Sequence, residues 1–124
     1  MAEIKISDLS IGDWVMYRDR EWQVCSLYKF TEEVGLLRKD SQFCEYVSDL
    51  HPIPLTPEIL EKNGFVKEED EDGNKRYSLI EGGTKFSLGY ARSVFQWTFP
   101  IDVRFVHKLQ NLLRFCGLKK EIEL

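Results

Sequence analysis

The sequence predicts an α+β fold, built from a bent antiparallel sheet and two main helices at about residues 57–63 and 103–116. Three observations support this prediction. The first part of the chain has short segments of alternating side-chain character separated by tight turns, which is typical of strands. A helix with both start and stop signals follows, and the last part has an apolar stripe at helical spacing. The 124 residues suffice for one domain, 1–124, with an N-terminal β lobe at about 1–54 and a second lobe at about 55–124.

Four strands are expected in the N-terminal lobe, because side chains alternate along short segments that end at turn residues. Trp14 and Met16 lie on one side of the first segment, with Val15 and Tyr17 on the other. The expected strands are 13–18, 21–29, 34–38 and 42–47. So many short strands in so few residues predict a small, strongly bent sheet, similar in shape to SH3-like barrels.

Aromatic side chains of this lobe are candidate binding residues, since small barrels of this shape often hold peptides or nucleic acid with exposed rings. Tyr17 and Trp22 are the candidates here. In the alternative interpretation, Trp14, Tyr17 and Trp22 fill the core or cover the sheet.

The first helix has the start and stop signals of a complete element. Thr56 can be the N-cap, and Pro57 takes the first helical position, where its missing N–H costs nothing. Asn63 and Gly64 supply the left-handed end. We therefore expect a helix over about 57–63.

The second lobe is expected to contain further strands and the last helix. Asp72-Gly73-Asn74 predicts a hairpin turn, Asp102 is the expected cap of the last helix, and Gly117 its end. The strands are predicted at 65–69, 75–80, 84–88, 93–99 and 118–124.

The last helix has an apolar stripe and a polar surface at helical spacing. The predicted buried residues are Phe105, Val106, Leu109, Leu112, Leu113 and Cys116. The polar surface supplies further candidate partner contacts, namely Arg104, His107, Lys108 and Arg114. In the alternative interpretation, His107 is simply a surface residue.

Charge is unevenly distributed along this chain of net charge −4. Residues 1–83 carry 10 Lys and Arg against 18 Asp and Glu, whereas residues 84–124 carry seven against three. The basic C-terminal half indicates either a solvated surface or a face that meets an anionic partner, including nucleic acid.

No motif for catalysis or cofactor binding occurs in the sequence, so we predict no catalytic, cofactor-binding or metal-binding residues and no enzymatic activity. Residues 82–85 resemble a phosphate-binding loop, but the pattern GxxxxGK[ST] is absent and a glycine turn is expected instead. His107 and Cys116 would lie on opposite sides of a helix, so they cannot share a metal ion. The thiols of Cys25, Cys44 and Cys116 are expected to be buried and reduced.

The chain is expected to be cytoplasmic, because no apolar run approaches the roughly 20 residues of a membrane span. Its first residues also lack the apolar core of a signal peptide.

Three segments together resemble a known group of proteins. They are Ile11-Gly12-Asp13-Trp14-Val15, residues 52–65 (PIPLTPEILEKNGF) and residues 106–113 (VHKLQNLL). In this order they resemble a family of small uncharacterised proteins of gut Bacteroidetes and their prophages and mobile elements. The resemblance implies an accessory protein and carries no activity, cofactor or site residue.

The leading functional hypothesis is a non-enzymatic module that binds a protein partner through the aromatic residues of the first lobe and the exposed face of the last helix. The alternative is nucleic-acid binding through the basic C-terminal half. Phosphate contacts would weaken steeply with added salt, whereas an apolar protein interface would not. Catalysis is the third hypothesis.

Overall fold

The computed structural model of this chain describes residues 4–97 and 101–124. Strand residues make up 44% of the structure and helical residues 19%, so the molecule is mostly β and the predicted α+β class is wrong. The chain forms two compact units. Unit 1 consists of Met1–Pro54 and Phe105–Asn111, and unit 2 of Leu55–Arg104 and Leu112–Leu124.

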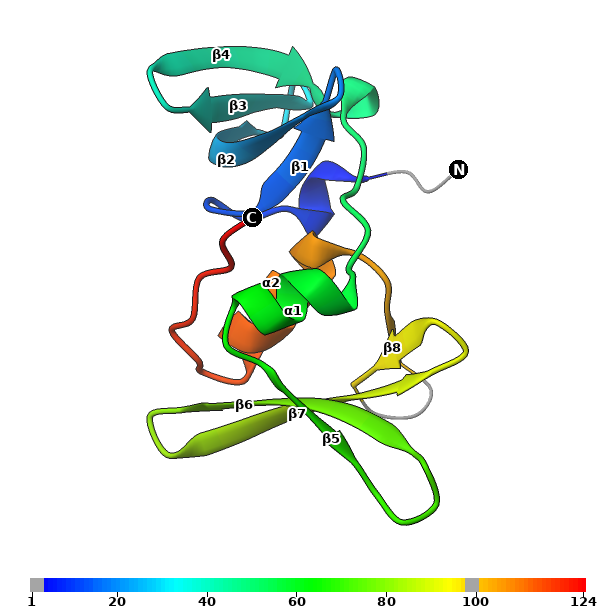
Figure 1. Cartoon of the computed structure of the whole chain (residues 1–124). Helices are drawn as coiled ribbons and strands as arrows, with labels where there is room; N and C mark the ends of the chain where they lie inside the picture. Colours follow the sequence, from blue (N-terminus) through cyan, green and yellow to red (C-terminus); the bar gives the residue numbers. More distant parts are fainter. Residues whose placement is uncertain (1–3, 98–100) are drawn as a thin grey trace. The chain divides into compact units, whose positions relative to one another are not determined.

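Unit 1 contains a four-stranded antiparallel meander in the order β1-β2-β3-β4 (Figure 1). Its strands are β1 (Trp14–Tyr17), β2 (Arg20–Tyr28), β3 (Glu33–Arg38) and β4 (Ser41–Tyr46). Arg18 and Asp19, both at positive φ, join β1 to β2 in a two-residue turn whose twist suits a hairpin. Because β1 and β4 are opposite edges of an open sheet, the predicted barrel does not form among the described residues.

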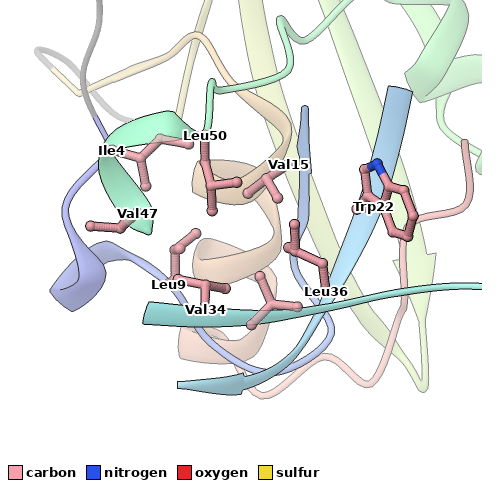
Figure 2. Close-up of a cluster of buried hydrophobic side chains, with 9 residues drawn as sticks. Ile4, Leu9, Val15, Trp22, Val34, Leu36, Val47 and Leu50 are labelled. Atoms are coloured by element: carbon pink, nitrogen blue, oxygen red, sulfur yellow. The ribbon is translucent and has the colours of Figure 1, made fainter. Parts of the chain in front are cut away.

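The core of unit 1 lies on one face of this sheet. Val15, Val34 and Leu36 point from the strands toward residues of the chain before and after the sheet, and Trp22 lies at the edge of the same cluster (Figure 2). Those flanking segments contain two short 3-10 helices, η1 (Ile6–Asp8) and η2 (Val47–Asp49). Their neighbourhood supplies Ile4, Leu9, Val47 and Leu50, and Val24 of β2 completes the buried cluster.

Unit 2 begins with α1 (Pro57–Lys62), whose predicted ends are confirmed. The hydroxyl of Thr56 accepts a hydrogen bond from an amide of the first turn at 3.3 Å. Gly64 has φ +89°, and Phe65 donates its N–H to the carbonyl of Leu60 at 3.0 Å. This bond and the left-handed glycine form the Schellman ending expected from the sequence.

The second sheet is an antiparallel meander of five strands in unit 2. The predicted hairpin is confirmed, but the predicted strand 93–99 is only three residues long, and positions 98–100 lie outside the described residues. The strands are β5 (Val66–Glu69), β6 (Lys75–Glu81), β7 (Thr84–Ala91), β8 (Val94–Gln96) and β9 (Asp102–Val103).

The predicted terminal strand at 118–124 is wrong. That segment is held instead by the buried side chain of Asn63, whose amide nitrogen donates to the Glu123 carbonyl at 2.8 Å. The Asn63 oxygen in turn accepts from the Glu123 N–H at 2.7 Å.

The main helix, α2 (Val106–Phe115), starts three residues later than predicted. Asp102 is not its cap, because Asp102–Val103 is β9 and pairs with β8. Phe105 is also extended and forms a bridge with Pro54. Pairing with β8 and the bridge to Pro54 therefore outcompete the local helical preference of residues 102–105.

We predict that Gly64→Ala destabilises the protein by about 1–2 kcal/mol, because an L side chain resists a left-handed conformation. A Cβ added at Gly64 would make only an ordinary van der Waals contact, with Leu79 at 3.8 Å. The loss of stability would therefore come from the backbone conformation and not from a steric clash. The matched control is Gly89→Ala, which lacks positive φ and has its nearest neighbour at the same distance. Urea melts would measure both, and an equal loss in the two variants would contradict this account of the helix end.

Candidate functional site

The β1 edge of the first sheet is covered by the chain itself. Met16 and His51 exchange backbone hydrogen bonds of 2.8 and 2.9 Å. The N–H of Trp14 donates to the side-chain oxygen of Gln110 at 3.1 Å, and the Gln110 amide nitrogen donates to the carbonyl of Gly12, also at 3.1 Å. The outward N–H groups of Trp14 and Met16 therefore have partners.

The β4 edge is open. The N–H of Val47 donates to the carbonyl of Glu32 at 2.8 Å, which identifies this opposed pair as hydrogen-bonded. Hydrogen-bonded and non-bonded pairs alternate along an antiparallel ladder, so Tyr46, Cys44 and Gln42 direct their backbone N–H and C=O away from β3. Within residues 4–97 and 101–124, no strand or isolated bridge pairs with that side of β4.

An apolar hollow of about 560 Å³ lies at the turn between β2 and β3. Its lining is formed by Leu27, Tyr28, Lys29, Phe30, Thr31, Glu33 and Cys44. Tyr28 is 50% exposed, and Phe30 is fully exposed. Tyr46, 55% exposed, aligns with Tyr28 through their common neighbour Glu33 on β3. Because Cys44 both lines the hollow and belongs to the open edge, the hollow and the edge form one candidate site.

The predicted aromatic candidates lie on the opposite, inner face of the sheet. Trp22 is buried and meets the ring of Phe43 edge-on at 4.8 Å, and Tyr17 lies 5.5 Å from the same ring. The Tyr17 hydroxyl donates to Glu45 at 2.7 Å, and this bond, followed by burial, raises the pKa of the phenol. Trp22 therefore belongs to the core and Tyr17 borders it, as the alternative interpretation expected.

Tyr17 also lines a second, more polar hollow of about 420 Å³ in unit 1. Its other lining residues are Met16, Arg18, Asp19, Glu45, Asp49 and His51. Among the residues that the structure describes, no group of three His, Cys, Asp or Glu side chains is arranged to hold a metal ion.

The basic candidates of the C-terminal segment are exposed but do not gather on one helix face. Arg104 precedes α2 and pairs with Asp102 at 3.1 Å. Lys108 and Arg114 are six residues apart on α2, which places them about 120° apart around its axis. Lys108 belongs to unit 1 and Arg114 to unit 2.

His107 is buried, with 3% of its surface exposed, so its predicted surface position is wrong. Its ring stacks on Phe105 with centroids 6.0 Å apart, and Nδ1 has no hydrogen-bond partner among the described residues. Burial, and secondarily the charge of Lys108, lowers the pKa of the imidazole, against an opposing effect of Asp8. The buried face of α2 is shifted from the predicted stripe and includes Val106, His107, Leu109, Gln110 and Leu113.

The thiol predictions need one correction. None of the three cysteines forms a disulfide, but Cys44 is exposed, and Cys25 and Cys116 are only half-buried. Cys44 is exposed because it lies on the outer face of an edge strand. The alternation of residues 42–47 shows that two faces exist but does not indicate which of them is buried.

Known protein families, characterised proteins and solved structures give no match to this chain. No helix in the described parts of the chain has the length and apolarity to cross a bilayer.

We predict that His107 makes stability depend on pH. The pKa of His107 is lower in the folded protein than in the unfolded chain, so the unfolded chain binds a proton at higher pH. Stability is therefore lost as the pH falls below the pKa of the unfolded chain, about 6.5. The contribution cannot exceed about 1.4 kcal/mol per pH unit. Unfolding free energies between pH 7 and pH 5 should therefore fall less steeply for His107→Gln than for the parent.

The matched control for this experiment is His51→Gln, since His51 is exposed. That variant should keep the slope of the parent. An unchanged slope in His107→Gln would contradict the effect of burial on this histidine.

Proposed function

We propose that this protein is a non-enzymatic interaction module that binds a peptide segment of another protein at the apolar hollow of unit 1. The observation that supports the proposal is the group of exposed rings, Tyr28, Phe30 and Tyr46, around and beside that hollow. Exposed aromatic clusters of this kind are typical of protein-binding surfaces, where a few large rings supply most of the binding energy.

The expected binding free energy comes from removing these rings from water. Burying a fully exposed Phe side chain is worth about 1.5–3 kcal/mol, so Phe30 alone could change affinity about tenfold or more. The hollow beside it offers space for a side chain of the partner, with Leu27 and Tyr28 in its lining.

Nucleic-acid binding is the weaker candidate. Residues 1–54, which make up most of unit 1, carry six Lys and Arg against ten Asp and Glu, a balance that repels phosphates. In the basic C-terminal half, the ion pair of Arg104 with Asp102 and the separation of Lys108 and Arg114 around α2 argue against one compact basic patch. The role of an accessory protein of mobile elements stays a prediction from the resemblance.

Selection of phage-displayed random peptides on the immobilised protein tests this proposal. Enriched peptides, made synthetically, should bind the parent and lose about tenfold or more in affinity for Phe30→Ser. The matched control is Phe115→Ser, which changes a 79% exposed phenylalanine of unit 2 and should leave peptide affinity unchanged.

Two results would contradict the proposal. One is the absence of any enriched peptide, and the other is equal affinity for the parent and Phe30→Ser. A parallel titration of labelled DNA addresses the alternative, because tight binding that weakens steeply with salt would favour nucleic acid as the partner.

A further inference from the structure

We propose that the bound segment adds to the open edge of β4 as a fifth strand, with alternate apolar side chains over the hollow and a basic residue beside the Tyr46 end. This inference rests on the proposed function and specifies its partner as an extended, apolar and positively charged peptide.

The first argument is the contrast between the two edges of one sheet. An unpaired edge is a template for another strand, and proteins commonly cover or block such edges. Here the β1 edge has partners at Trp14 and Met16, through Gln110 and His51. The β4 edge carries no Pro or Lys and offers the N–H and C=O of Gln42 and Cys44. The chain therefore protects one edge and leaves the other open for pairing.

The second argument is the position of the hollow relative to that edge. Strand addition obtains affinity from backbone hydrogen bonds and specificity from pockets for alternate side chains. Cys44 contributes outward backbone groups to the edge and lines the apolar hollow. A strand that pairs with β4 therefore brings every second side chain to the face where Tyr28 and Tyr46 are exposed.

Charge complementarity selects the occupant. The outer-face residues of β4, Gln42, Cys44 and Tyr46, are uncharged. The carboxylate of Glu45 accepts from the Tyr17 hydroxyl at 2.7 Å and from the N–H of Tyr46 at 3.3 Å. Uncharged, apolar side chains of the partner therefore suit the strip itself.

Acidic residues lie at the Tyr46 end of the strip, although Lys29 also lines the hollow. Glu33 is the neighbour of Tyr46 on β3, and Glu32 is the neighbour of Val47, so carboxylates gather at the Tyr46 end of the strand. With ten acidic against six basic residues, segment 1–54 attracts a basic segment and repels a second copy of itself. A basic peptide is therefore the better occupant than a dimer partner.

The experiment removes a single outward N–H of β4. Cys44→Pro deletes this donor, and the inward ladder bonds to β3 do not use it, so an edge position of this kind tolerates proline. Cys44→Ala is the matched control, because it removes the thiol and keeps the N–H. Affinity for a synthetic peptide enriched on the parent should fall about tenfold or more in Cys44→Pro and change less than about threefold in Cys44→Ala.

A second arm does not depend on the folding of the proline variant. Peptides are made in which one backbone amide at a time is N-methylated. Methylation of an amide that faces β4 should abolish binding to the parent, and methylation of the amides between those positions should be tolerated. Glu33→Lys should also weaken the binding of peptides that carry a basic end.

The outcomes separate the two proposals. If no peptide binds the parent, both the module and the strand addition are overturned. A second outcome is that Phe30→Ser loses binding, that Cys44→Pro and Cys44→Ala bind equally well, and that N-methylation has no effect that alternates along the peptide. In that case the protein is still a peptide-binding module, but the strand addition is wrong.

Discussion

The first unit depends on one buried amide, the side chain of Gln110. It accepts from the N–H of Trp14 and donates to the carbonyl of Gly12, so it connects α2 to the start of β1 and satisfies an outward N–H of that edge. Gln110 is 3% exposed, and losing either partner of such a buried bond costs about 1–3 kcal/mol. Because the β1 edge is covered in this way, the free edge of the sheet is β4, beside the exposed rings.

Elements defined by local signals could be predicted from the sequence, and elements defined by distant partners could not. The cap at Thr56 and the glycine ending of α1 act within a few residues, and both are confirmed. The start of α2 depends on pairing with the preceding strand β8 and on the bridge to Pro54, which lies far away along the chain. Gln110 falls on the buried stripe, four residues after Val106, and this spacing is the signal that could have identified it.

The candidate site escaped prediction because of a register shift in β2. Strict alternation from Trp22 and Val24 would place Tyr28 on the same, inner face. The register shifts between Val24 and Ser26, so Leu27 packs against the core and Tyr28 faces outward opposite Glu33. A bulge of this kind has no reliable sequence signature, and Phe30 in the following turn belongs to no periodic pattern. The sequence therefore favours Tyr17 and Trp22 as candidates, whereas the structure places both rings on the inner face.

Amide hydrogen exchange of the free protein, resolved by NMR, tests the difference between the two edges most directly. The N–H groups of Trp14 and Met16 should exchange slowly, because they donate to Gln110 and His51. Those of Gln42 and Cys44 should exchange rapidly, while Phe43 between them is protected by β3. Protection of Gln42 and Cys44 equal to that of Trp14 and Met16 would contradict an open β4 edge.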